Sequence, residues 1–115
     1  MKLNSDEQTL AENKLLILYI LSKVGKSITH KELLELVISI SDMNYFYFQQ
    51  FLLDLIEDKY ISKYEKNNEE IFELTPTGKE ALILTIDLLP GILKLEVDNK
   101  FKENFDTIKN KKTHL

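Results

Sequence analysis

The sequence predicts a mainly α-helical domain with one small β-hairpin, followed by a C-terminal helix. Three observations predict this fold class: helical apolar patterns with capping residues up to about residue 58, short β-prone segments between residues 60 and 74, and an isolated apolar stripe beyond residue 90. With 115 residues, 43% apolar and 30% charged, the chain has the composition of an ordinary soluble domain with one core. We expect a folded domain over residues 1–90 and an amphipathic helix over residues 91–115.

The first predicted helix covers residues 9–24. Thr9 and Glu12 have the spacing of a capping box, and Gly25 is a plausible stop. Residues 15–21, LLILYIL, leave this helix without a polar face, and a helix that is apolar all round is buried all round. In a small chain we expect one side to meet the core and the other to meet a second subunit.

The next two helices follow closely. Thr29 and Glu32 form a second capping box, which opens a helix through KELLELVISI. A third helix is expected to begin near Ser41 or Asp42, both good N-caps, and to run to about Asp58.

After about residue 58 the apolar pattern changes from helical to β-like spacing. Residues 60–64 and 71–74 are β-prone and flank a polar stretch over 65–70, which predicts a hairpin. Thr75 is expected to cap a fourth helix with Pro76 at its first position, running to a break at residues 90–91.

The last segment has one apolar stripe, with spacings of four, four and three, on an otherwise charged helix. We predict that it is a dimer arm; the alternative is that it folds back on its own domain. The expected dimer interface combines this stripe with the first helix: Leu15, Leu18, Tyr19, Val97, Phe101, Phe105 and Ile108. The basic end over residues 109–112 is expected to fray.

This order of elements is that of a winged helix-turn-helix domain. YISKYEKNNEEIFELTPTGKEAL resembles the wing and following helix of PadR-like and MarR-like bacterial regulators, in which a leu-thr-x-x-gly segment closes the second wing strand, here Leu74, Thr75 and Gly78. More closely, LAENKLLILYIL together with MNYFYFQQFLLDLIE is similar to a family of short bacterial winged-helix proteins. That family is catalogued as a domain of unknown function and taken to be transcriptional regulators. The similarity covers residues 8 to about 105 and implies the fold and a regulatory role.

In such a fold the third helix would enter the DNA major groove. At about 100° per residue, Tyr45, Phe48, Phe51, Leu52 and Leu55 should face the core, while Phe46, Gln50, Leu53 and Glu57 should face outward. Asparagine and glutamine can pair with adenine, a ring can pack on a thymine methyl, and lysines or helix N-termini can meet phosphates. The predicted contacts to double-stranded DNA are Thr29, Lys31, Asn44, Phe46, Tyr47, Gln49, Gln50, Lys63, Tyr64, Lys66, Asn67 and Asn68.

The charge balance opposes this interpretation. All fifteen basic residues are lysine, and the first 93 residues contain nine lysines and fifteen acids, a net charge of −6. DNA affinity depends largely on neutralised phosphates. The alternative hypothesis is therefore a winged-helix module for protein–protein interaction that does not bind DNA, in which Phe46 and Tyr47 pack under a loop, a neighbouring subunit or a partner.

Other function classes find little support in the residues. The chain has no cysteine, which excludes disulfides and thiolate metal sites, and His30 is expected to be an exposed polar residue. With no carboxylate pair, catalytic triad or glycine-rich phosphate loop, we expect neither an enzyme nor a bound cofactor or metal. The acidic start and the short apolar run predict a cytoplasmic protein without a membrane span. Any small-molecule effector is left open.

Overall fold

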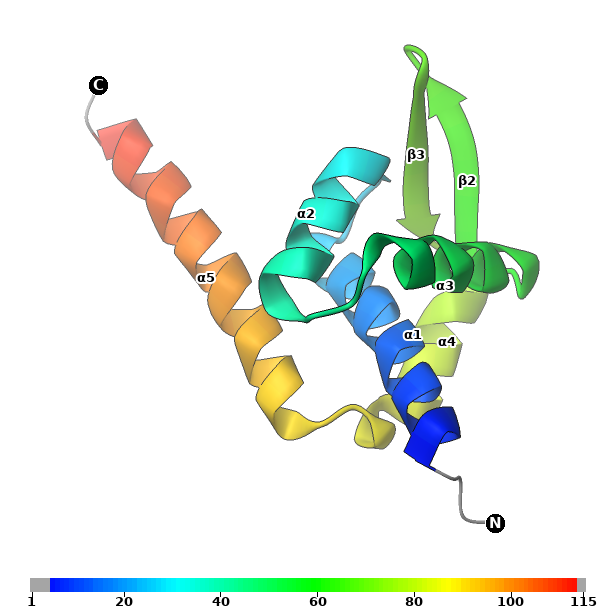
Figure 1. Ribbon diagram of the computed structural model, residues 1–115. Helices are drawn as coiled ribbons and strands as arrows, with labels where there is room; N and C mark the ends of the chain where they lie inside the picture. Colours follow the sequence, from blue (N-terminus) through cyan, green and yellow to red (C-terminus); the bar gives the residue numbers. More distant parts are fainter. Residues whose placement is uncertain (1–4, 114–115) are drawn as a thin grey trace.

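The computed structural model describes the backbone of residues 5–113 and the side chains of residues 7–102. The described chain is mostly helical, with one small antiparallel sheet, as predicted (Figure 1). Its elements in order are α1 (Ser5–Val24), β1 (Ile28–Thr29), α2 (His30–Ile40), α3 (Tyr45–Glu57), β2 (Ile61–Lys66), β3 (Glu69–Leu74), α4 (Pro76–Thr85), the 3₁₀ turn η1 (Ile86–Leu88) and α5 (Gly91–Thr113).

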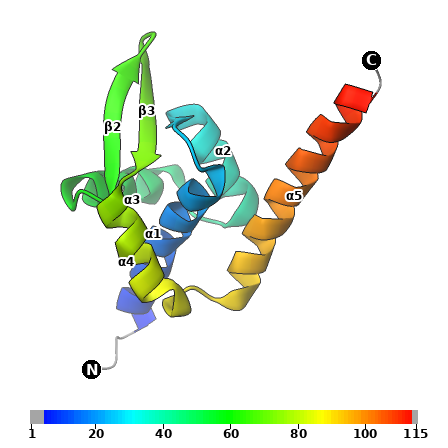
Figure 2. The ribbon, with the colours of Figure 1, turned by 180° about the vertical axis from the view of Figure 1, so that it is seen from behind.

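Helix α1 is the central element of the core. It packs against α2, α3, α4 and α5, so that its own chain surrounds it (Figures 1 and 2). Leu16, Ile17 and Ile20 are completely buried, as expected for a helix without a polar face. Leu15 and Leu18 are also buried within one chain. The expectation that a second subunit must cover them is therefore wrong, because α4 and α5 return to cover that side.

Two helix starts differ from the prediction. Helix α1 begins before Thr9, which lies inside the helix and does not cap it. Helix α3 begins at Tyr45, and its N-cap is Asn44, whose Oδ1 accepts a hydrogen bond from Tyr47 N at 2.9 Å. Ser41 instead ends α2: its backbone N–H and its hydroxyl both donate to the carbonyl of Val37. The capping box of α2, from Thr29 to Glu32, is confirmed.

The sheet has three strands in the order β1–β3–β2. The predicted hairpin is present, but its strands are longer than expected and its turn is only Asn67–Asn68. Both asparagines have positive φ, 54° and 65°, the backbone of a type I′ turn. Strand β1 is not among the predicted elements. Its two residues pair with β3, with Ile28 opposite Phe72. It ties the start of α2 to the hairpin.

Helix α4 begins as predicted, with Thr75 as its N-cap and Pro76 in its first turn. It ends at Thr85, earlier than expected, and η1 follows. No helix within residues 5–113 is both long and apolar enough to span a membrane.

The first half of α5 folds back on its own domain. Val97 is completely buried and Phe101 packs partly buried against the core. Tyr19 Oη donates to Asp98 Oδ1 at 2.7 Å, and Lys23 Nζ lies 3.4 Å from the same oxygen. Val97 is therefore covered by its own chain and not by a second subunit, whereas Tyr19 and Phe101 are only partly covered and their place in a dimer interface stays a prediction. The side chains of Phe105, Ile108 and residues 109–112 lie outside the described residues.

Candidate nucleic-acid interface

Helices α2 and α3 form a helix-turn-helix, and the β2–β3 hairpin stands beside them as the wing (Figure 1). The outward side of α3 is open: Phe46 is 73% exposed, and its neighbours are about half exposed. We call this side the α3 outer face; it consists of Tyr45, Phe46, Tyr47, Gln50 and Leu53. No residue from 45 to 53 is charged, so the first two turns of α3 present rings and amides only.

The core side of α3 agrees with the predicted geometry except at one residue. Phe48, Phe51, Leu52 and Leu55 are buried, as expected. Tyr45 was expected in the core but is 56% exposed. The reason is that the ring of His30 occupies the space beneath it.

His30 was predicted to be an exposed polar residue, and this is wrong. Its ring is half-buried, with its centroid 5.5 Å from that of Phe48 and 5.9 Å from that of Phe72. Tyr45 then packs edge-on against His30 at 6.2 Å. No local sequence pattern predicts this burial, because the partners of His30 come from α3 and β3.

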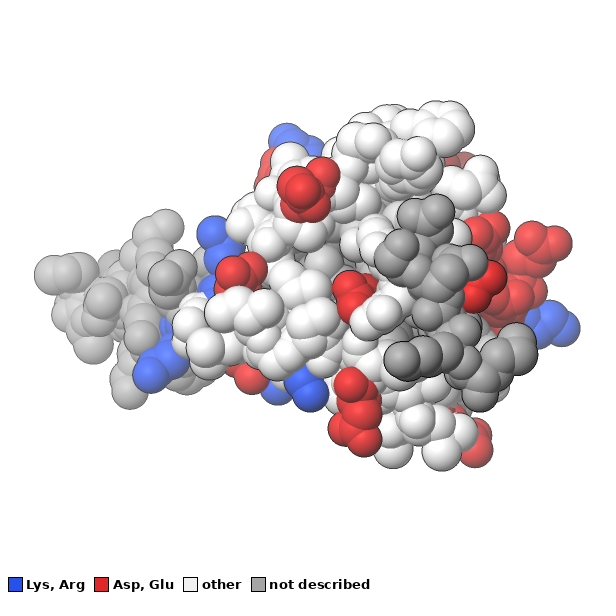
Figure 3. Space-filling model, turned by 60° about the horizontal axis from the view of Figure 1, so that its bottom comes forward, with Lys and Arg blue, Asp and Glu red and all other residues white. Residues whose placement is uncertain are grey.

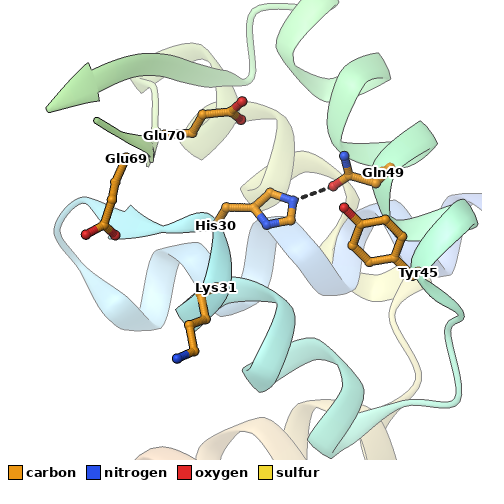
Figure 4. Close-up of a pocket in the computed structure, with 6 residues that line it drawn as sticks. All are labelled: His30, Lys31, Tyr45, Gln49, Glu69 and Glu70. Atoms are coloured by element: carbon orange, nitrogen blue, oxygen red, sulfur yellow. Dashed lines mark hydrogen bonds between the residues drawn. The ribbon is translucent and has the colours of Figure 1, made fainter. Parts of the chain in front are cut away.

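A shallow cavity of about 360 Å³ opens at this junction (Figure 4). Its walls come from the start of α2, the start of α3 and the end of the wing: His30, Lys31, Tyr45, Gln49, Glu69 and Glu70. Within it, His30 Nε2 is hydrogen-bonded to Gln49 Oε1. This bond fixes the amide of Gln49 relative to α2.

The three amides predicted to contact bases are all engaged within the chain. Asn44 Oδ1 caps α3, and Gln49 Oε1 is bound to His30. Gln50 Nε2 donates to Asp54 Oδ1 at 3.1 Å, while Lys14 Nζ lies 3.2 Å from the other oxygen of that carboxylate. Pairing with both edge atoms of an adenine uses the oxygen and the nitrogen of one amide. Each internal bond occupies one of the hydrogen-bonding positions of the amide and orients the side chain, so a contact with adenine must use the remaining positions or replace that bond.

The wing residues that are predicted to contact DNA lie on a hairpin that is acidic overall. Lys63, Tyr64, Lys66, Asn67 and Asn68 are all exposed. The same two strands hold four glutamates, at positions 65, 69, 70 and 73, against two lysines. Lys66 stands directly opposite Glu69. The net charge of −2 on the wing opposes close approach to phosphates.

The start of α2 presents Lys31 to solvent, but its capping box limits what else it can bind. Thr29 Oγ1 accepts from Glu32 N at 3.2 Å, and Glu32 Oε1 accepts from Thr29 N at 3.2 Å. The carboxylate of Glu32 thus already lies where a phosphate would meet the positive end of the helix. At the start of α2, Lys31 is then the group that can attract a phosphate.

Among the described side chains, no three His, Asp or Glu residues are grouped to hold a metal ion. The order of elements, the helix-turn-helix and the flanking hairpin define the class of this protein: it is a winged helix-turn-helix protein.

The chain belongs to the family described as "Domain of unknown function (DUF4364)", which residues 13–115 match. The resemblance to a winged-helix family of this kind is thereby confirmed. No curated protein matches the chain. Among solved structures, Sso10a-2, a DNA-binding protein from Sulfolobus solfataricus, is similar at 18% identity and a TM-score of 0.46, over 88% of this chain and 92% of that one.

Proposed function

We propose that this protein is a DNA-binding transcriptional regulator that acts as a homodimer and reads a pseudo-palindromic site with α3. One observation carries the proposal: the first two turns of α3, the part of a helix-turn-helix that meets base edges, are open and uncharged. Two copies related by a two-fold axis would place two such helices in successive major grooves.

The chemistry of the α3 outer face favours A·T pairs. Phe46 and Tyr47 offer apolar surface for thymine methyls, and Gln50, whose amide nitrogen also donates to Asp54, offers an amide for adenine. Lys31, Lys63 and Lys66 are the cations placed to meet the backbone. Because wing glutamates offset them, base contacts must supply an unusually large share of the affinity.

The decisive test is selection from a pool of random duplexes at low salt, using the full chain. We expect enrichment of an A·T-rich, two-fold symmetric sequence. Titration of the selected duplex against salt should then give a modest slope of log K on log [salt], no steeper than about −5, because three lysines per subunit can contact about six phosphates. No enrichment and no salt dependence would refute the proposal.

Variants separate base contacts from phosphate contacts. Gln50→Ala should relax the sequence preference at one position, while Lys66→Ala should weaken all duplexes alike and flatten the salt slope. Lys102→Ala is the matched control, since it removes the same charge from an exposed position on α5, outside the helix-turn-helix and wing. It should leave both preference and slope close to those of the unaltered protein.

A second candidate function is a protein-interaction module without DNA binding. The observation that favours it is the combination of a 73% exposed Phe46 with an acidic wing, which suits a protein surface better than a phosphate backbone. Capture of one stoichiometric protein partner, lost in Phe46→Ser, together with no duplex enrichment, would establish this function in place of the first.

A further inference from the structure

A second group of exposed apolar side chains lies on the end of α4, on η1 and on the start of α5. Five large side chains there are half to nearly four-fifths exposed; we call them the α4–α5 apolar surface, and they are Ile83 (72%), Leu84 (78%), Leu88 (51%), Ile92 (63%) and Leu95 (54%). Figure 3 views the molecule from the bottom of Figure 1, where broad uncharged areas are interrupted by isolated acidic and basic groups. Large apolar side chains that are exposed close together along the chain are typical of an interaction site.

These residues are exposed because the same segment has already filled the core with other side chains. Leu82, Leu89 and Val97 are buried, and they alternate along the chain with the exposed set. The segment is therefore apolar on two sides, and one of them has no cover within the described residues. Of the residues first expected to bind a second subunit, Leu15, Leu18 and Val97 are on the covered side.

We infer that the α4–α5 apolar surface is a homodimer interface and that its occupant is the same surface of a second copy. The inference deepens the proposed function, on which the need for two copies rests. The five side chains offer roughly 500–600 Å² per subunit, which approaches the ~800 Å² per partner of a standard stable interface once a polar rim is added.

Charge supports a second copy as the occupant. The whole chain carries a net charge of −4, and the wing is acidic, so most faces of two copies repel each other. Residues 79–102 hold four lysines and four acids and are neutral as a group. Two copies can therefore meet through this segment without net repulsion, and both signs of charge are available on each copy for the rim.

The position of the surface agrees with two-fold assembly on DNA. The joint between α4 and α5 is at the end of the molecule opposite the tip of the wing (Figures 1 and 2). Pairing there leaves α3 and the hairpin of each copy uncovered. In such an isologous interface each side chain is buried twice, once from each subunit.

The test is sedimentation velocity of the full chain at tens of micromolar. We expect a species of twice the 13.5 kDa chain mass. Leu95→Asp and, separately, Leu84→Asp should raise the dimer dissociation constant at least ~100-fold, since each change acts at two symmetric positions. Ile38→Asp is the matched control: Ile38 is 53% exposed on α2, against 54% for Leu95, and should leave the dimer intact. Circular dichroism checks that each variant is folded.

The outcomes separate this inference from the proposed function. An unaltered chain that is monomeric at about 100 μM, well above the dissociation constant of a stable interface, overturns the inference, as does a folded Leu95→Asp protein that remains a dimer. A dimer that is broken by Leu95→Asp but enriches no duplex supports the inference and overturns the proposed function. A dimer that enriches a two-fold symmetric duplex but remains a dimer in Leu95→Asp overturns the inference and supports the proposed function.

Discussion

Gly78 is the residue at which a single added carbon should do most harm to this fold. It lies in the first turn of α4, where its backbone N–H donates to the Thr75 hydroxyl at 2.9 Å. A Cβ on Gly78 would overlap the carbonyl oxygen of Tyr60 and lie 2.8 Å from Leu74 Cδ1. The turn after α3 and the start of α4 are in backbone contact here, and glycine permits that approach.

The expected cost of Gly78→Ala follows from the bonds at this contact. To make room, α4 must move away from residues 59–60, which strains the bonds from Thr75 N to Tyr60 O (3.1 Å) and from Thr75 Oγ1 to Lys59 O (2.7 Å). Two weakened hydrogen bonds at about 1 kcal/mol each and about 1–3 kcal/mol of overpacking outweigh a gain of about 1 kcal/mol in helix propensity. We expect a net loss of roughly 2–4 kcal/mol and a fall in Tm of roughly 10–15 °C.

Thermal and urea unfolding, followed by far-UV circular dichroism, measure this effect. Gly91→Ala is the matched control, because it adds the same carbon in the first turn of α5 where nothing lies within 4 Å. That change should be neutral or stabilising by up to about 1 kcal/mol. If Gly78→Ala melts within about 2 °C of Gly91→Ala, a difference of less than about 0.5 kcal/mol for a domain of this size, the reasoning about close backbone approach is refuted.

Three further predictions concern other elements. Val97→Ala should cost about 2 kcal/mol in urea unfolding, since Val97 is fully buried against its own chain; no change would mean that α5 is not docked. Asn68→Ala should cost about 1 kcal/mol and Asn68→Gly should not, because φ at this residue is +65° and only the former adds strain; equal midpoints for the two would contradict the turn type. Burial, and then the hydrogen bond to Asp98, raise the pKa of Tyr19 above 10.0. The folded state thus favours the neutral phenol, and this stabilisation is present below pH 10 and is lost as the pH rises through the folded-state pKa. Urea midpoints from pH 8 to 11 should therefore fall more for the unaltered protein than for Tyr19→Phe, and parallel curves would refute the assignment.

Local capping chemistry made most of the fold predictable. Thr29 with Glu32, and Thr75 with Pro76, are short-range signals whose partners lie within three residues, and both mark helix starts in the structure. The start of α3 was misplaced because Ser41, Asp42 and Asn44 are all good caps in sequence, and only the end of α2 decides among them. Strand β1 has two residues and forms solely because β3 lies beside it, so no local pattern could reveal it.

Which side chains are exposed was less predictable, because exposure depends on which elements pack back against the core. The apolar band of α1 correctly predicted burial all round, but the covering elements are α4 and α5 of the same chain. The exposed residues of the α4–α5 apolar surface share a stretch with buried Leu82 and Leu89, and helical period does not separate the two sides across the break at Pro90. The position of His30 beneath Tyr45 likewise depends on the approach of three elements.

Under the proposed function, the charge pattern makes dimerisation more important for DNA binding than it would be in a basic winged-helix protein. One subunit offers Lys31, Lys63 and Lys66 to DNA, while its wing holds four glutamates, so a single domain has little electrostatic attraction for phosphate. Linking two α3 helices makes the second contact intramolecular and multiplies the affinity without adding charge. The proposed arrangement would also discriminate strongly among sequences, because nonspecific binding depends on phosphate contacts that this surface largely lacks. In the proposed function an uncharged α3 outer face and a neutral α4–α5 apolar surface are therefore complementary requirements: the first would contact bases, and the second would bring two copies of it to one site.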